Sequence, residues 1–435
     1  MNLHRSQFIK KMINILWVSL IVFISIVPYY YTSESINPTV RLVVKYFPFF
    51  LIILISISTY FKFGRVSLLG NHFFVERYSN VFMVILLHTF VCFISLWDAG
   101  NVSLGFTKLI YFTISGPWLA LLIIYSFKNI DEVEFLTSAL STTGCMVAGY
   151  GCYAYITGNN FVWDSSIFTY VYHDNLNSFR ATSTLGNALY LGAYCTLLIP
   201  FYFWEMQNRK DYKRYLFYGG LLLTVLALFL TLSRGALISG FFVITISTIY
   251  GRKNLLIFFP LSLSLLALSY WNFPEMAEKL AEDLYSRVES LKNFAESESF
   301  RLGQFETAAG IIQKHFFLGI GFGNFVDQYE MFRAESVPRW PGSKTTENMY
   351  LMILCETGIL GIVTFLLSAV AILIRFFYDS KSATSDIQKY ASIAVLGVLV
   401  NMFTWDLLNQ PTLRMLFWIV VGIGLSGGRR SCIVS

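Results

Sequence analysis

The stretch LFYGGLLLTVLALFLTLSRGALISGFFVITISTIYG, residues 216–251, decides the fold class. Its one charged residue is Arg234, near the middle. A helix needs about 20 apolar residues to cross roughly 30 Å of hydrocarbon. The stretch is therefore long enough for two short membrane-spanning helices. The polar break at Ser233, Arg234 and Gly235 is the place where they would meet in a tight turn.

The same apolar pattern recurs along the whole chain. Of its 435 residues, 55% are hydrophobic and only 13% are charged, which is far more apolar surface than one soluble core needs. We predict an all-α polytopic membrane protein, with residues 1–435 as a single transmembrane domain of about 12 transmembrane helices. The expected spans lie near residues 12–30, 43–61, 79–97, 105–126, 134–157, 185–204, 215–232, 235–250, 254–271, 349–375, 390–408 and 412–426.

The positive charges predict the orientation. The formal net charge is +6, and most basic residues fall in short loops on one side of the predicted spans, as cytoplasmic loops require. An even number of spans puts both termini on that side. We therefore expect both termini in the cytoplasm and no nucleic-acid partner. The six cysteines form no close CxxC pair, so we expect no disulfide framework and no zinc site. We also expect no other metal site and no cofactor.

Two longer polar loops are predicted outside the cytoplasm. The smaller spans residues 158–184 and the larger spans residues 272–348. In the larger loop, apolar residues recur at helical spacing after Pro274, and a second helix is expected over 300–313. Glycine- and proline-rich sequence follows and predicts irregular backbone. We therefore expect one large helical extracytoplasmic loop.

Three arginines are predicted on this outer side. Arg234 lies at the break between two spans, Arg180 just before a span, and Arg301 at the start of a loop helix. Each could be an interfacial charge that reaches lipid phosphates. Together they favour a shared anionic ligand, because a guanidinium matches phosphate oxygens with two parallel hydrogen bonds.

Glu347 and Asn348 lie between the large loop and the next span. One interpretation is a helix start, in which the hydroxyl of Thr345 or Thr346 caps the helix. The other makes Glu347 a general base for a sugar hydroxyl. Glu356 is expected about 13 Å deep in that span, with a structural partner.

The motifs FRATSTLGN, TLSRGALISG, FRLGQFETAAGIIQKHFFLGIGFGNF and ENMYLMILCETGILG follow one another over residues 180–370. In this order they resemble the superfamily of O-antigen ligases and Wzy-type polymerases. The resemblance implies a GT-C-like, inverting, metal-independent glycosyltransferase in the bacterial cytoplasmic (inner) membrane, with its active site facing the periplasm or exterior. Residues 180–370 would form its ligase/polymerase-like core.

The resemblance also implies the substrate and the residue roles. An undecaprenyl-diphosphate-linked glycan would be donor and acceptor, in contact with membrane lipids, and a polysaccharide chain-length regulator would be a partner. Arg234 and Arg301 would bind the diphosphate, with Arg180 and Asn348 beside them. Glu347 would be the base or would orient the acceptor hydroxyl.

Ligases of the superfamily carry a histidine before the asparagine, where this chain has Glu347, so the sequence favours an O-antigen polymerase. A ligase that transfers the finished glycan to lipid A-core or another acceptor stays the alternative. A polysaccharide flippase is disfavoured, because transporters place ionisable groups near the midplane and often repeat their halves.

Overall fold

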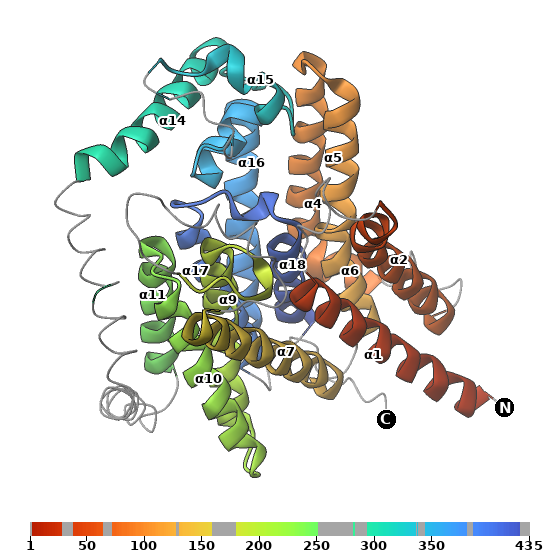
Figure 1. Ribbon diagram of the computed structural model, residues 1–435. Coiled ribbons are helices and arrows are strands. Elements are labelled where there is room, and N and C mark those ends of the chain that lie inside the picture. Colours follow the sequence, from red (N-terminus) through yellow and green to blue (C-terminus); the bar gives the residue numbers. More distant parts are fainter. Residues whose placement is uncertain are drawn as a thin grey trace.

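The computed structural model is helical throughout the part of the chain that it describes, and it contains no strand there (Figure 1). The described residues are 2–27, 38–63, 72–127, 130–158, 180–250, 282, 294–335, 337, 344–380 and 386–426. The predicted span at 254–271, the loop helix after Pro274 and most of the smaller loop lie outside these ranges.

The first third of the chain supplies six of the helices. The break between α5 and α6 is caused by Gly116 and Pro117, since proline fits the first turn of a new helix but lacks the N–H that would continue the previous one. The predicted span at 105–126 is therefore two helices. The bounds are α1 (Asn2–Ile26), α2 (Pro38–Phe63), α4 (His72–Ser95), α5 (Val102–Ile114), α6 (Pro117–Ser126) and α7 (Ile130–Thr157), with a 3-10 turn η2 (Leu96–Asp98).

In the rest of the described chain the expected helices are found with two corrections, and the second, a break in the predicted span at 349–375, is described below. The predicted span at 390–408 is too long, because α17 ends at Asn401 and an irregular turn follows. The predicted loop helix at 300–313 falls within α14. The bounds are η3 (Ser183–Leu185), α9 (Ala188–Asn208), α10 (Lys213–Leu230), α11 (Arg234–Tyr250), α14 (Phe294–Lys314), α15 (Phe325–Phe332), α16 (Met349–Ser380), α17 (Ile387–Asn401), η5 (Leu407–Asn409) and α18 (Pro411–Ser426).

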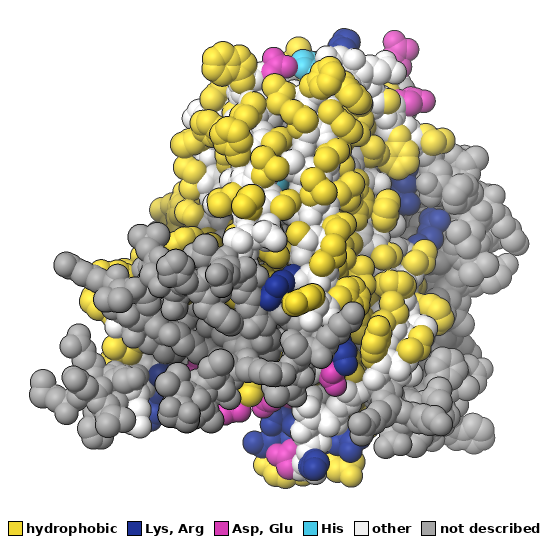
Figure 2. All heavy atoms as spheres, turned by 180° about the vertical axis from the view of Figure 1, so that it is seen from behind, with side chains coloured by type: hydrophobic (Ala, Val, Ile, Leu, Met, Phe, Trp, Pro, Cys, Tyr) yellow, Lys and Arg dark blue, Asp and Glu magenta, His cyan; other side chains and the backbone are white. Residues whose placement is uncertain are grey.

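Six stretches among the described residues are long and apolar enough to cross a membrane. They are Gln7–Ile26, Leu42–Phe61, Tyr78–Asp98, Val102–Ser126, Lys213–Leu230 and Met349–Tyr378, and α11, α17 and α18 are shorter apolar helices. Large hydrophobic side chains are exposed along α2, α4 and α16. On the face in Figure 2, hydrophobic side chains dominate the described surface. Such a surface is suited to lipid. The chain is a multi-pass membrane protein.

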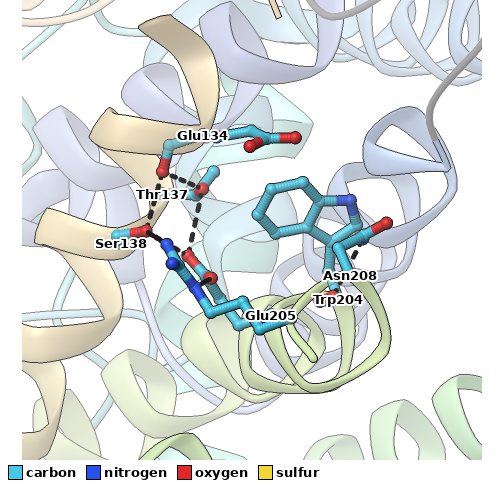
Figure 3. A network of polar contacts seen from close by, with 7 residues as sticks. Glu134, Thr137, Ser138, Trp204, Glu205 and Asn208 are labelled. Atoms are coloured by element: carbon cyan, nitrogen blue, oxygen red, sulfur yellow. Dashed lines mark hydrogen bonds and ion pairs between the residues drawn. The ribbon is translucent and has the colours of Figure 1, made fainter. Parts of the chain in front are cut away.

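Helix α9 lies at the centre of the bundle. It packs against α7, α10, α11 and α17, and nearly all its side chains are buried. A polar network ties its end to α7 (Figure 3). Buried Glu205 accepts hydrogen bonds of 2.6 Å from Ser138 Oγ and from Arg209 Nε. A buried carboxylate needs such partners, and these fix one end of the central helix.

Helix α16 reverses direction at Gly358. The backbone there has φ 65° and ψ −167°, a conformation that is essentially restricted to glycine. The rings of Tyr350 and Phe365 lie 6.2 Å apart, whereas fifteen residues of straight helix would separate them by about 22 Å. Residues 349–357, which we call the short arm, therefore fold back beside the start of the long arm, residues 359–380.

Distant backbone completes this reversal. The N–H of Ile359 donates to the carbonyl of Phe316, and the N–H of Ile320 donates to the carbonyl of Cys355, both at 2.9 Å. Peptide groups that the break frees are thereby satisfied. The expected depth of Glu356 stays a prediction, and this residue lies near the end of the short arm, just before the reversal. Its structural partner is confirmed, since its Oε1 accepts from the N–H of Phe325 at 3.3 Å.

We expect Gly358→Ala to destabilise the protein by about 1–3 kcal/mol, the usual cost of a side chain in this backbone conformation. A Cβ would also lie 2.2 Å from the carbonyl oxygen of Phe317. The thermal midpoint of the purified protein in detergent measures the loss. Gly219→Ala in α10 is the control, since its Cβ would meet nothing within 4 Å. Equal midpoints for the two variants would contradict the strained reversal.

Candidate functional site

The segments that begin α16 and α11, far apart in sequence, both meet the turn after α17. The N–H of Met349 donates to the carbonyl of Met402 at 2.9 Å, and Asn348 Nδ2 donates to the carbonyl of Phe403 at 3.1 Å. At Gly235, a Cβ would lie 2.0 Å from Thr404 Oγ1, so only glycine allows this contact. The starts of α16 and α11 are therefore fixed against one turn, residues 402–406.

Arg180 and Arg234 both lie at the turn between α10 and α11. Arg180 Nε donates to the carbonyl of Thr231 at 2.8 Å, and the N–H of Ala181 donates to that of Leu230 at 2.9 Å. Arg234 is the first residue of α11 and is exposed. The tight turn predicted from the sequence is confirmed, and Arg180 lies against it.

The structure pairs Arg301 with Glu347. Arg301 Nε lies 2.7 Å from Glu347 Oε2, and 37% of the Arg301 side chain is exposed against 15% of that of Glu347. Arg301 comes from α14 and Glu347 from the segment before α16. A charged pair at this distance is a strong hydrogen bond as well as an ion pair. Two residues chosen separately from the sequence are thus in direct contact.

Asn348 has a structural role at the start of α16. Its Oδ1 accepts from the N–H groups of Tyr350 and Leu351, at 2.9 and 3.1 Å, and so caps the short arm. The prediction of a hydroxyl cap is therefore wrong. The hydroxyls of Thr345 and Thr346 instead accept from the N–H groups of Glu347 and Asn348. These bonds hold the chain in an irregular path before the helix.

Strained backbone marks the site. Among the described residues, the non-glycine residues with positive φ are Ser183 at 53°, Leu232 at 49° and Glu347 at 51°. Ser183 follows Arg180 by three residues, and Leu232 precedes Arg234 by two. Such strain costs energy and collects at functional sites, where surrounding contacts hold it in place. No sequence motif predicted these positive φ values.

Asp406 is not among the site residues predicted from the sequence. The structure places it in the turn after α17, where its Oδ2 accepts from Asn409 Nδ2 at 3.1 Å. Burial raises the pKa of this carboxyl to about 6, and the charge of Glu347 adds to the rise, while a hydrogen bond with Thr345 opposes it. A long-range contact of this kind has no local sequence signal.

The glycines of GIGFGNF form a tight loop, as predicted. Gly319, Gly321 and Gly323 all have positive φ. A Cβ on them would collide with the backbone of α16, with Ala99 and with Lys108 respectively. Lys108 Nζ in turn donates to the carbonyl of Gly323. The loop therefore joins α5 to the tip of α16.

A cavity of about 340 Å³ lies beside the carboxylates. It reaches from the ends of α1 and α2, past α4 and α5, to the short arm and the start of α18. Lys344, Met349 and Asp406 belong to its wall and also flank Glu347. The candidate site thus combines the arginines with a neighbouring cavity. No group of three His, Cys, Asp or Glu residues that could hold a metal ion occurs in the described ranges.

Comparison with known proteins gives one finding. Residues 219–366 match the model of the Wzy_C family, described as O-antigen ligase, and this match includes Arg234, Arg301 and Glu347. No curated protein matches the chain. The matched residues lie within the predicted core at 180–370. The resemblance to the O-antigen ligase and Wzy-type superfamily is confirmed over residues 219–366.

Proposed function

We propose that this protein is an O-antigen polymerase that joins undecaprenyl-diphosphate-linked repeat units at the outer face of the cytoplasmic membrane. The family match supports glycosyl transfer from a lipid-linked glycan. The observation that carries the proposal is the contact between Arg301 and Glu347. Asn348 and Gly235, the neighbours of Glu347 and Arg234, both contact the turn at residues 402–406. In this proposal the fold has about twelve spans of GT-C type, with both termini cytoplasmic.

The arginines would act on the leaving group. Sugar C1 bonded to a diphosphate is already activated, and negative charge grows on the diphosphate as that bond breaks. Preorganised cations at this position stabilise the transition state without a metal. Arg234 and Arg301 are proposed to face the diphosphate, and Arg180, fixed to the same turn by Thr231, to support them.

Glu347 would act on the acceptor. Its carboxylate either takes the proton of the attacking hydroxyl or orients that hydroxyl, and attack from the face opposite the diphosphate inverts C1. Asn348, whose amide is engaged by the short arm and Phe403, would contribute by fixing the position of Glu347. In this proposal Asn348 lies beside the substrate, as the sequence predicts, and its role there is to position Glu347.

The polymerase is preferred to a ligase on one observation. Glu347 stands where ligases of the superfamily carry histidine, and Arg301 neutralises its charge. A ligase that moves finished glycan to lipid A-core or another acceptor is the second candidate. A chain-length regulator is a proposed partner of the polymerase only, because a ligase receives chains of finished length.

Deleting the gene in its host and separating the surface glycans on a gel tests the proposal. We expect a lipid core bearing a single repeat unit, and restored long chains when the wild-type gene is supplied. Core without glycan, together with long polymer on undecaprenyl diphosphate, would establish the ligase. An unchanged glycan ladder would contradict both and revive the transporter interpretation.

A further inference from the structure

The cavity beside Asp406 is lined by aromatic rings and by polar side chains. Aromatic rings line it from α2, α5, the GIGFGNF loop, α15 and the long arm of α16. These are Phe49, Tyr111, Phe112, Phe322, Phe325 and Phe365. Ligand sites in proteins are typically cavities of about 300–1,000 Å³ with mostly apolar walls and a few placed polar groups. The cavity has the size and character of such a site.

Polar groups are set into these aromatic walls. They are Lys45, Lys108, Glu356 and Asp406, with Asn409 hydrogen bonded to Asp406. A hydrocarbon tail would offer these groups nothing beyond the partners they have in the protein, which include Gly323 for Lys108, Phe325 for Glu356 and Asn409 for Asp406. Each group retains hydrogen-bonding capacity that such a tail could not use. A sugar suits them better, since its C–H faces pack on aromatic rings while its hydroxyls meet charged and amide groups. The lining therefore favours a saccharide over a lipid chain.

Asp406 joins this cavity to the reaction centre. It belongs to the cavity wall, its carboxylate is hydrogen bonded to Thr345, and it lies close enough to Glu347 for their charges to interact. Glu347 Oε2 is in turn held by Arg301 at 2.7 Å. Two neighbouring carboxylates do not ionise independently, and the one without a cation partner holds a proton more readily.

We propose that this cavity binds the terminal sugar of the acceptor glycan and that Asp406 accepts the proton of its attacking hydroxyl. The inference rests on the proposed function and assigns its acceptor site. Glu347 is then the carboxylate that stays charged against Arg301 and orients the hydroxyl.

The step balances as follows. The acceptor O–H proton moves to the Asp406 carboxylate, and the hydroxyl oxygen forms a bond to C1 of the donor sugar. The bond from C1 to the diphosphate oxygen breaks, and its electron pair leaves with undecaprenyl diphosphate, toward Arg234 and Arg301. One glycosidic bond replaces one glycosyl phosphate bond, with inversion at C1. The proton on Asp406 returns to solvent after product leaves.

The proposal predicts that the transfer rate falls at low pH, and we call this fall the acid limit. With a pKa of about 6, Asp406 is charged above that pH and can accept a proton, whereas below it the rate falls tenfold for each pH unit. Thr345 lowers this pKa through its hydrogen bond, so Thr345→Ala moves the limit to higher pH. Among the described residues, the other titratable and charged groups that face Asp406 or share its cavity are Glu347, Glu356, Lys45, His88, Cys92, Lys108, Tyr111, Lys344 and Arg414.

The test uses the full-length protein in lipid nanodiscs. The donor is the host's undecaprenyl-diphosphate-linked repeat unit, and the same repeat-unit oligosaccharide on a non-phosphorylated alcohol serves as acceptor. Asp406→Asn is expected to lower kcat by about 10²–10⁴-fold and to remove the acid limit from the residual rate, while donor binding is unchanged. Asp386→Asn is the control, because that exposed carboxylate pairs with Lys389 at the start of α17.

A second variant tests the cavity itself. Tyr111→Ala is expected to raise KM for the acceptor roughly tenfold and to leave KM for the donor unchanged. Tyr153→Ala in α7 is the matched control, since Tyr153 is exposed and absent from the cavity wall. If the wild type is active and the Asp406→Asn variant keeps both its rate and its loss of rate at low pH, this inference is overturned, whereas the proposed function is not. A wild type that transfers glycan to no acceptor overturns the proposed function as well.

Discussion

Replacing Arg301 by alanine should reduce polymer formation at least about 100-fold, the usual effect of removing one preorganised donor from a developing negative charge. The variant loses the guanidinium proposed to face the diphosphate. It also loses the 2.7 Å contact that holds Glu347. Arg234→Ala should have the same effect. Surface glycan on a gel, compared with the amount of protein in the membrane fraction, measures the loss.

Two further variants make the Arg301 result specific. Arg301→Lys keeps the charge but not the planar fork, so we expect partial activity at most. Lys314→Ala removes a cation from the same helix, where Lys314 lies over the ring of Phe332, and should leave polymer formation intact. Normal glycan from properly inserted Arg301→Ala protein would remove this arginine from the reaction.

Replacing Glu347 should separate activity from stability. Glu347→Ala and Glu347→Gly should both abolish polymer formation, because neither leaves a carboxylate to orient the acceptor. Glycine adopts the φ of 51° at this position without strain, whereas alanine does not. The glycine variant should therefore be more stable than the alanine variant by about 1 kcal/mol.

Thermal unfolding of the two purified Glu347 variants, beside their glycan profiles, provides the measurement. Equal midpoints would contradict the claim that strain is stored at this residue. Full activity in either variant, with normal membrane insertion, would show that Glu347 neither accepts a proton nor orients the hydroxyl.

The sequence predicted the helices well, because membrane-spanning helices follow from length and apolar content alone. It also predicted the turn before Arg234, and it singled out Arg301 and Glu347, which the structure brings into contact, since their motifs are local. It could not predict the reversal at Gly358. An apolar run reads the same whether it is one helix or two arms, and the peptide partners that permit the break come from Phe316 and Ile320.

For a related reason, the sequence did not predict that Asp406 lies near Thr345 and Glu347. The sequence shows a single acid near the end of a predicted span, and its neighbours Thr345 and Glu347 lie some sixty residues earlier in the chain. Likewise, the positive φ values of Ser183 and Leu232 depend on packing between remote segments. Local motifs identify individual groups, whereas their mutual placement requires the fold.

The position of Arg234 as the first residue of α11 has an electrostatic consequence. Aligned peptide dipoles give the amino end of a helix about half a positive charge, which normally favours acidic residues there. Here the dipole and the guanidinium have the same sign at the same place. Both attract an anion at the turn between α10 and α11. A diphosphate at this corner would be stabilised by the backbone of α11 as well as by the arginine side chain.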